Sequence, residues 1–438
     1  MLKESKDINP VELLQKLIQF NTTNPPGNEN ECIRYIEKLL SEVGIETKIV
    51  GKTQRRTNLI ARLKGDGSAA PFLMYGHVDV VTTENQTWKH SPFKGTIDDD
   101  CVYGRGTLDM KGAIAMMVSS LIKIKTSKII PHCDIILCIV SDEESDGKYG
   151  ARYVVENYAH LFENVKYAIG EVGGFTMYIG EKKFYPIMVA EKQRCCLKIV
   201  TRGKGGHGSM PIHDGAMAKL GSILTALDQK KLPAHITQPA KIMINEMAKN
   251  FEPQIGEILK GLTNPSECDK ILEVLGNKMS FFDPILHNSV SPTIVRGGNK
   301  INVIPSEITL ELDGRILPGY SVENILDEVK SIIGEIGEIS VTSYDPGPQL
   351  VDLKMFNTLS DIIKEGDKEG IPIPFVMAGV TDARFFSKLG IQTYGFTPML
   401  FPKDIMYSKL IHASNERIPL KALEFGTNSI FKLLNTIR

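Results

Sequence analysis

Cysteine is scarce in this sequence and does not occur in the pairs that disulfide frameworks or zinc fingers require. The chain has seven cysteines among 438 residues, an odd number, and it has no CxxC motif. A disulfide-stabilised scaffold and a structural zinc finger are therefore excluded as classes for this chain. A reducing cytoplasm is the expected location.

The sequence also lacks an excess of charge and long apolar runs. Lysine and arginine total 51 against 52 aspartates and glutamates, a formal net charge of -1. This balance gives no electrostatic reason to expect binding to nucleic acid or to an anionic membrane. The longest apolar runs, such as residues 135–140, are too short to cross a bilayer, and the first twenty residues have no apolar signal-peptide core. We expect neither a nucleic-acid nor a membrane partner.

What the sequence does have is a first half in which predicted strands and helices alternate. Strands are predicted at 58–63, 71–75, 134–140 and 166–169, with helices between them at 111–125 and 148–158. Alternation of this kind is typical of an α/β domain with a mixed, mostly parallel sheet flanked by helices. Two N-terminal helices are also predicted, one capped by Asn9 before Pro10, the other opened by a capping box of Asn28 and Glu31.

The pattern changes near residue 192. Strand, helix, strand, strand, helix and strand follow in the order of a ferredoxin-like α+β unit, interrupted by a long helix-prone stretch at about 231–288. A chain of this length should form two or three domains. We therefore predict a catalytic domain of residues 1–191 and 348–438, and an inserted α+β lid domain of residues 192–347.

Two motifs at predicted strand ends carry candidate functional side chains. His77 follows one strand, and Asp79 two residues later can face the same way and hydrogen-bond the imidazole. Glu143 and Glu144 follow the strand at 134–140, so that one could bind a metal while the other faces its bound water. A surface turn for the first motif and a solvated acidic loop for the second are the alternatives, and each motif alone leaves them open.

Three further candidates are weaker when taken singly. Asp109 lies just before the helix predicted at 111 and could simply be a capping residue. Glu171 ends a strand, and His412 precedes the last helix, where a histidine is more often a capping or surface residue.

The set is more specific than its members. His77, Glu143, Glu144 and Glu171 all fall at the carboxyl ends of consecutive strands, which is the edge where open α/β sheets bind ligands. Two histidines and three carboxylates, one of them bridging, suit a pair of divalent ions that each keep an open position. We therefore predict a two-metal site.

Seven motifs follow one another along the chain: GHVDVV, GRGTLDMKG, SDEES, GKGGHGSMP, NVIPSE, TDARFF and IHASNE. Together they resemble the zinc-dependent aminoacylase and exopeptidase superfamily, which includes acetylornithine deacetylase, succinyl-diaminopimelate desuccinylase, carboxypeptidase G and aminoacylase. The resemblance is greatest to the carboxypeptidase and aminoacylase branches. It implies a zinc-exopeptidase-like catalytic domain with an inserted lid, and a homodimer formed through that lid.

The resemblance also implies two metal-binding sets that share one aspartate. The ligands are His77, Asp109 and Glu171 for one ion, and Asp109, Glu144 and His412 for the other. Zinc is the expected metal, with cobalt or manganese as alternatives. Asp79 would orient His77, Glu143 would be the general base for a metal-bridging hydroxide, and the peptide bond after Asp109 would be cis.

Three more residues match family positions that meet the substrate, and Arg384 is a further candidate. His207 would stabilise the oxyanion, and the alternative for it is a simple glycine-rich turn. Asn302 and Arg315 in the lid, together with Arg384, would bind polar groups and the carboxylate of the substrate, since a guanidinium donates two parallel hydrogen bonds to a carboxylate. For Arg384 a structural ion pair is the alternative.

The expected activity is hydrolysis of an amide bond in small peptides, as in a carboxypeptidase or dipeptidase. The main alternative is an N-acyl amino acid deacylase, and the sequence does not separate the two substrates. A non-catalytic metal-binding protein of the same fold would not need Glu143. A dinuclear phosphoesterase would want a basic phosphate clamp, and none stands out.

Overall fold

The computed structural model describes residues 8–276, 281–347 and 351–438. The chain divides into two compact units. The first unit comprises Met1–Val189, Asp352–Phe375 and Thr381–Arg438, and the second comprises Ala190–Val351 and Val376–Val380. The predicted return of the chain to the catalytic domain at residue 348 lies outside the described residues.

A nine-stranded sheet forms the centre of the first unit. Its order is β1(Glu46–Gly51), β2(Thr57–Leu63), β6(Ile135–Val140), β3(Phe72–His77), β7(Tyr167–Gly170), β17(Gln392–Gly395), β9(Lys182–Glu191) and β16(Ile371–Met377), with β8(Met177–Ile179) beside β9. The strands β6, β3, β7 and β17 run parallel, whereas β1 and β2 on one side and β9 on the other are antiparallel to their neighbours. The predicted mixed, mostly parallel α/β sheet is confirmed.

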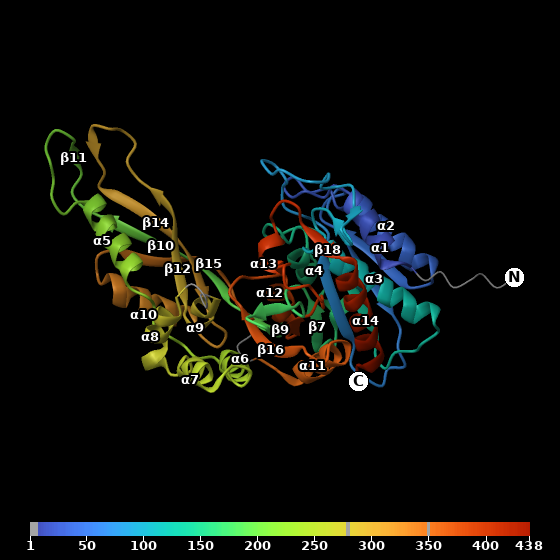
Figure 1. The fold of residues 1–438 in the computed structure, drawn as a ribbon. Helices are drawn as coiled ribbons and strands as arrows, with labels where there is room; N and C mark the ends of the chain where they lie inside the picture. Colours follow the sequence, from blue (N-terminus) through green and yellow to red (C-terminus); the bar gives the residue numbers. More distant parts are fainter. Residues whose placement is uncertain (1–7, 277–280, 348–350) are drawn as a thin grey trace. The chain divides into compact units, whose positions relative to one another are not determined.

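Burial on both faces explains why the central strands are mostly apolar. Every residue of β3 and of β6 is buried, as expected where helices cover both faces of a parallel sheet. The long helix α3(Lys111–Thr126) is buried almost all round because it packs against α1(Pro10–Gln19) and α14(Leu420–Thr436). Figure 1 shows these three helices together. None of the described helices has both the length and the apolar character needed to cross a membrane.

Shorter elements complete the first unit. They are α2(Asn30–Glu42), α4(Ala151–Tyr158), η1(Ala159–Phe162), α11(Lys354–Gly366), α12(Ala383–Phe386), η3(Ser387–Leu389), α13(Tyr407–Leu410) and a small sheet of β18(Arg417–Pro419), β5(Cys101–Tyr103) and β4(Thr96–Asp98).

The two N-terminal helices test the predicted capping. Asn9 accepts a hydrogen bond from Val11 N at 2.8 Å, as predicted. The capping box of Asn28 and Glu31 is wrong: α2 begins at Asn30, and its N-cap residue, Glu29, makes no side-chain capping bond. The Glu29 carboxylate is instead bound by Arg56, whose Nη2 lies 2.7 Å from Oε1. The N-cap carboxylate is therefore engaged by a residue distant in sequence, which the local pattern does not indicate.

The second unit is built on a four-stranded antiparallel sheet with two helices. Its order is β12(Ser289–Arg296), β14(Glu307–Ile316), β10(Gln193–Arg202) and β15(Glu338–Asp345). Alternate residues of β10 are buried against α5(Ala216–Gln229) and α10(Val322–Ile333). The predicted ferredoxin-like order is present, with a small ribbon of β11(Gly206–His207) and β13(Val303–Ile304).

Most of the described part of the helix-prone stretch at 231–288 is helical. It contains α6(Gln238–Ala248), α7(Pro253–Gly261), α8(Pro265–Leu275) and α9(Asp283–Leu286). Thr237 caps α6 and Asn264 caps α8, each followed by a proline in the first turn.

Candidate metal centre

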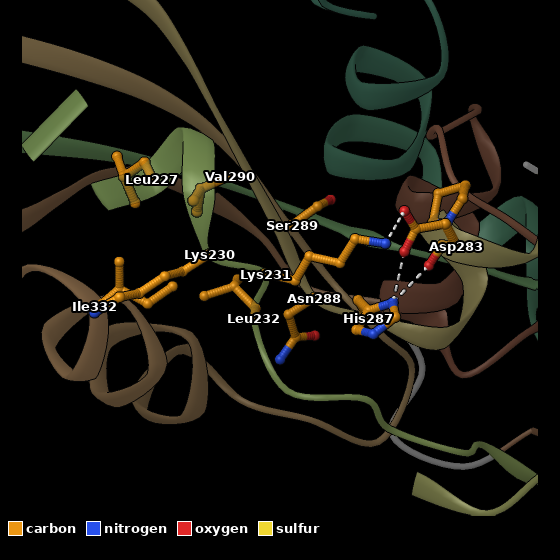
Figure 2. A pocket seen from close by; sticks show the side chains of 11 residues that line it. Leu227, Lys230, Lys231, Leu232, Asp283, His287, Asn288, Ser289, Val290 and Ile332 are labelled. Carbon is orange, nitrogen blue, oxygen red and sulfur yellow. Dashed lines mark hydrogen bonds and ion pairs between the residues drawn. The ribbon is translucent and has the colours of Figure 1, made fainter. Parts of the chain in front are cut away.

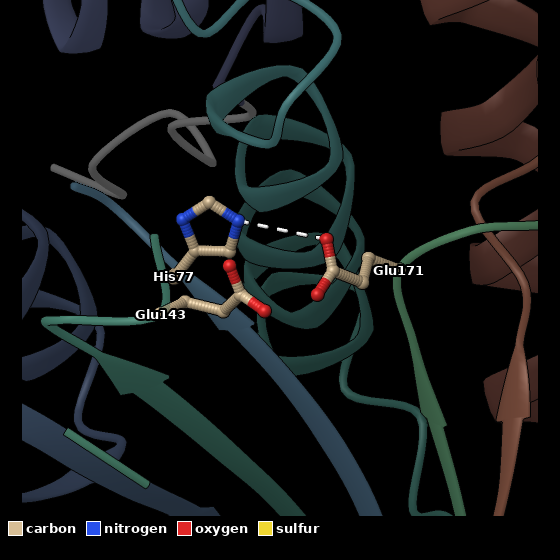
Figure 3. Close-up of side chains that lie close together, drawn as sticks. All are labelled: His77, Glu143 and Glu171. Carbon is tan, nitrogen blue, oxygen red and sulfur yellow. Dashed lines mark ion pairs between the residues drawn. The ribbon is translucent and has the colours of Figure 1, made fainter. Parts of the chain in front are cut away.

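Three neighbouring parallel strands bring the predicted site residues to one edge of the sheet. His77 is the last residue of β3, the pair Glu143 and Glu144 follows β6, and Glu171 follows β7. Because β6, β3 and β7 are adjacent, these side chains converge. Figure 3 shows His77, Glu143 and Glu171 pointing toward one another, with His77 Nε2 lying 3.6 Å from Glu171 Oε2.

Asp109 lies between the two histidines. Its Oδ1 is 3.1 Å from His77 Nε2, and its Oδ2 is 3.0 Å from His412 Nε2. The same His412 nitrogen is 3.2 Å from Glu144 Oε2. The structure therefore brings all five predicted metal ligands together, with the two oxygens of Asp109 facing different halves of the cluster.

Asp79 holds His77 and the turn at Glu143 in place. The side chain is fully buried, and its Oδ1 lies 3.4 Å from His77 Nδ1, which is also 3.0 Å from the Asp79 carbonyl oxygen. The carboxylate further accepts hydrogen bonds from the backbone N–H groups of Glu143 and Glu144, both at 3.1 Å. A single aspartate thus orients the imidazole and fixes the turn that carries two site glutamates.

Asn24, which was not predicted from the sequence, completes this support. Its Nδ2 donates to Asp79 Oδ2 at 2.9 Å and to Asp142 Oδ1 at 3.1 Å. Asn24 is 5% exposed, so the amide separates two carboxylates that would otherwise repel each other in a buried space. Its segment lies 55 residues before Asp79, and no local signal marks the contact.

Glu416 was also missed, although it belongs to the quoted IHASNE motif. It is fully buried and holds the loop that leads to Asp109. Its carboxylate accepts from the backbone N–H groups of Gly106, Leu108 and Asp109 and lies 2.5 Å from Arg105 Nη1. The peptide bond between Asp109 and Met110 is cis, as predicted.

The charges of the cluster depend on one another. Hydrogen bonds to Asp109 and Glu144 raise the pKa of His412 to about 10. Burial raises the pKa of Glu144 to about 7. Burial also raises the pKa of Glu143, and the nearby carboxylate of Glu171 raises it further. Positive charge in this cluster, whether a bound proton or a cation, therefore stabilises the buried carboxylates.

The donor set fits divalent ions. His77, Asp109 and Glu144 can offer ligand atoms within 4.8 Å of one another, and so can His77, Glu143 and Glu171. The other oxygen of Glu144, Oε1, is buried with no hydrogen-bond partner among the described residues. Imidazole nitrogens mixed with carboxylate oxygens are the ligands that zinc, cobalt and manganese accept.

Three predicted substrate residues lie on the second unit, and two of them, His207 and Arg315, have side-chain partners there. His207 is exposed on β11, with Nδ1 2.8 Å from Ser209 Oγ. Asn302 is exposed, next to β13. Arg315 on β14 donates from Nε and Nη2 to the two oxygens of Asp313, at 2.7 and 3.0 Å. The planar fork of Arg315 is therefore engaged by a carboxylate of the chain itself.

Arg384 and its neighbour Asp382 lie in the first unit, at and just before α12. Arg384 is 5% exposed, and its Nε is buried without a hydrogen-bond partner among the described residues. Both carboxylate oxygens of Asp382 are also buried without a hydrogen-bond partner among the described residues. Burial raises the pKa of Asp382 to about 8. The TDARFF motif contains both residues, but only the arginine was predicted from the sequence.

Gly170, which precedes the predicted ligand Glu171, is explained by packing. A Cβ atom at this position would lie 2.1 Å from Cζ of Tyr75. Tyr75 is a buried residue of β3, and the centroid of its ring lies 4.8 Å from that of the Phe386 ring. The aromatic ring therefore occupies the space that any side chain at position 170 would need.

Known proteins are similar to this chain in sequence and in fold. The chain is 27% identical over 416 residues to the Homo sapiens protein named N-fatty-acyl-amino acid synthase/hydrolase PM20D1, and the match covers 92% of this chain and 81% of that protein. It is 27% identical over 397 residues to a probable succinyl-diaminopimelate desuccinylase of Staphylococcus epidermidis, covering 86% of this chain and 85% of that protein.

Among solved structures, the fold matches an M20 family metallo-carboxypeptidase, Sso-CP2 from Sulfolobus solfataricus, with a TM-score of 0.69. The sequences are 17% identical, and the match covers 98% of this chain and 99% of that one. The sequence profile of peptidase family M20/M25/M40 matches residues 73–436. The chain therefore belongs to peptidase family M20/M25/M40.

Proposed function

We propose that this chain hydrolyses the amide bond before a C-terminal amino acid in small peptides, using two divalent metal ions. As a member of its family the chain is a metallohydrolase that acts on C–N amide bonds. The observation that carries the proposal is the position of Asp109 between the imidazoles of His77 and His412, at 3.1 and 3.0 Å. A carboxylate placed in this way suits a bridge between two ions.

We assign the ligands as the family resemblance implies. His77, Asp109 and Glu171 would hold one ion, and Asp109, Glu144 and His412 would hold the other. When bound, such ions supply Lewis acidity and make water nucleophilic near neutral pH. Zinc is the metal we propose first.

Glu143 is the residue to which we assign proton transfer. A carboxylate oxygen of Glu143 lies within 4.8 Å of ligand atoms of His77 and Glu171. Its backbone N–H donates a hydrogen bond to Asp79. Burial and the neighbouring Glu171 raise its pKa. A carboxylate with a raised pKa can take a proton from the attacking water and return it to the leaving amine at neutral pH.

Arg384 is the best-supported group for a substrate carboxylate. It is a buried guanidinium in the same unit as the metal ligands, and its Nε donor has no hydrogen-bond partner among the described residues. A buried donor of this kind costs free energy until an acceptor arrives. Arg315, whose fork Asp313 already engages, and Asn302 are weaker candidates. His207 remains our proposal for the donor that stabilises the oxyanion.

N-acyl amino acids are the second substrate class. The names of two relatives favour it, one a hydrolase of N-fatty-acyl amino acids and the other a desuccinylase. Both classes share an amide bond to an amino acid with a free carboxylate, and they differ in the acyl side. Rates for a panel of dipeptides and of N-acetyl, N-succinyl and long-chain N-acyl amino acids, each with zinc and with cobalt, would rank them.

The test of the mechanism is Glu143→Ala. We expect this variant to keep close to two metal ions per chain while kcat falls about 10²–10⁴-fold, because the base is lost and the ligands are not. Glu156→Gln, a change on the exposed side of α4, serves as the matched control and should have normal activity. Near-normal turnover by Glu143→Ala would exclude its role. Active wild-type protein with clearly fewer than two ions would exclude the paired site.

We also propose that the chain forms a homodimer through the second unit. β12 lies at the edge of its sheet, and it exposes Ile294 and Val295, at 39% and 52%. An exposed apolar edge strand favours pairing with another chain. Light scattering should give a dimer for the wild type and a monomer for Val295→Asp. Ile130→Asp, at a 72% exposed position of the first unit, should stay dimeric. A monomeric wild type would contradict the proposal.

A further inference from the structure

The second unit contains a cavity of about 250 Å³ whose lining includes none of the predicted metal ligands (Figure 2). It lies among the end of α5, the segment after it, α9, the first residues of β12 and the end of α10. Its lining residues are Leu227, Lys230, Lys231, Leu232, Asp283, Pro284, His287, Asn288, Ser289, Val290 and Ile332. The lining therefore combines apolar side chains with a serine, three basic side chains and the carboxylate of Asp283.

The serine of this cavity is in contact with a buried lysine. Lys192, on the segment between β9 and β10, is 1% exposed. Its Nζ lies 2.9 Å from Ser289 Oγ, 3.0 Å from the carbonyl oxygen of Pro284 and 2.8 Å from that of His287. All three contacts are to uncharged groups.

These three contacts can satisfy the hydrogen-bonding groups of Lys192 whether its amine is neutral or protonated. A carbonyl oxygen can only accept a hydrogen bond, whereas a hydroxyl can accept or donate one. A neutral lysine would donate its two N–H groups to the carbonyls of Pro284 and His287, and its lone pair would accept the proton of Ser289. The geometry therefore permits a proton to move between Lys192 and Ser289 without leaving either group without a partner.

The surroundings favour the neutral amine. Burial lowers the pKa of Lys192 to about 7, and the positive charge of Arg315 acts in the same direction. Asp283 and Glu328 oppose this shift. A lysine buried against a serine hydroxyl in this way can act as a base near neutral pH.

The nearby carboxylate does not pair with Lys192, because it already has two other partners. Asp283 Oδ2 is 3.0 Å from Lys231 Nζ, and Asp283 Oδ1 is 2.9 Å from His287 Nδ1, as the dashed lines of Figure 2 show. Lys230 lines the same cavity and has no ion-pair partner in the described part of the chain. Its ammonium is available to a negative charge that develops on a ligand.

We propose that Ser289 and Lys192 form a second, metal-independent acyl-transfer site that takes short-chain carboxylic esters. Ser289 Oγ attacks the ester carbonyl, while its proton passes to Lys192 Nζ. The bond between the carbonyl carbon and the alcohol oxygen breaks, and Lys192 returns the proton to the departing alkoxide. Water then releases the acyl group as a carboxylic acid by the same steps in reverse, with Lys192 again as the base.

The size of the cavity sets the substrate class. Its volume of about 250 Å³ lies just below the usual range for ligand-binding pockets, and its apolar lining includes Leu227, Leu232 and Ile332. A short acyl chain suits this space. This inference does not rest on the amide hydrolysis proposed above, because none of its residues belongs to the metal cluster.

The test uses the full-length wild-type holoenzyme and an alkyl fluorophosphonate, which forms a stable adduct with an activated serine and loses fluoride. Peptide mapping by mass spectrometry should find the adduct on Ser289. The labelling rate should rise with pH and level off above about 7, following the pKa of Lys192. Ser222 is the internal control, since this exposed serine of α5 bonds only to the Ala218 carbonyl among the described residues, and it should stay unlabelled.

Two variants separate the catalytic from the structural interpretation. Ser289→Ala should abolish labelling and p-nitrophenyl acetate hydrolysis in the presence of a chelator, while dipeptide hydrolysis by the metal-loaded protein stays normal. Lys192→Met should slow labelling about 100-fold or more, because it removes the base. If Lys192→Met does not fold, the wild-type pH profile decides alone. The proposal is overturned if Ser289 stays unlabelled, if Ser222 reacts as fast, or if the rate shows no plateau.

Discussion

The buried pair of Glu416 and Arg105 offers the sharpest test of how this chain holds its metal centre. We consider Glu416→Gln, which keeps the shape of the side chain and removes its charge. Glu416 is fully buried, and it accepts from three backbone N–H groups between Gly106 and Asp109 as well as from Arg105. The amide of glutamine can still accept with one atom, but its NH₂ group would face the donors of Arg105.

The magnitude follows from the charge left behind. Removing one partner of a buried ion pair costs about 3–5 kcal/mol, because the other charge stays buried without compensation. Glutamine keeps one acceptor, so we expect the lower end, about 3 kcal/mol. In a unit of this size that cost should lower Tm by roughly 6–12 °C. The uncompensated charge of Arg105 should also shift the 106–109 loop that carries the bridging ligand Asp109, and a shift of about 1 Å can lower kcat about 100-fold.

Thermal unfolding, metal content and kcat should be measured together on the same preparations. Glu156→Gln is the matched control, because it makes the same chemical change in an exposed ion pair. Its partner is Arg152 on the same helix, and the side chains of Arg152 and Glu156 are 51% and 58% exposed. Exposed pairs contribute at most about 1 kcal/mol, so this variant should be nearly unchanged. The double variant of Glu416→Gln with Arg105→Met should lose less stability than the two single changes added together.

Three outcomes would refute this reasoning. The first is a Glu416→Gln protein no less stable than the Glu156→Gln control. The second is additivity in the double variant, which would mean that the two charges do not depend on each other. The third is a destabilised variant with normal metal content and normal kcat, which would separate Glu416 from the position of Asp109.

Three further predictions concern the same centre. Asn24→Ala should weaken metal binding about 10-fold or more, since it removes a donor that holds Asp79; a competitive chelator titration would measure this, and unchanged affinity would contradict it. Metal affinity should keep rising with pH well above pH 7, by about tenfold per pH unit for each displaced proton. The reason is that hydrogen bonds in the metal-free protein raise the pKa of His412 to about 10. Buffer-dependent calorimetry would detect the released protons, and an affinity that levels off near pH 7 would contradict the prediction. His207→Ala should lower kcat, and mixing it with Glu143→Ala should restore activity if the histidine acts across a dimer; normal turnover by His207→Ala alone would exclude its role.

Much of the framework could be predicted from local sequence. Apolar segments such as residues 135–140 indicate buried strands because a parallel sheet is covered on both faces. Side chains that follow such strands meet at one edge, so His77, Glu144 and Glu171 could be grouped before any fold was known. The capping of the first helix by Asn9 was equally local. In each case the interaction spans a few residues or follows from strand direction alone.

The supporting contacts were decided only by the tertiary structure. Glu416 and Arg105 are 311 residues apart, and Asn24 is 55 residues from Asp79. Glu29, the N-cap residue of α2, pairs with Arg56, 27 residues away, and makes no capping bond. Lys192 meets Ser289 across 97 residues. A buried charge takes whichever partner the packed chain brings within about 3 Å, and sequence spacing does not specify that choice.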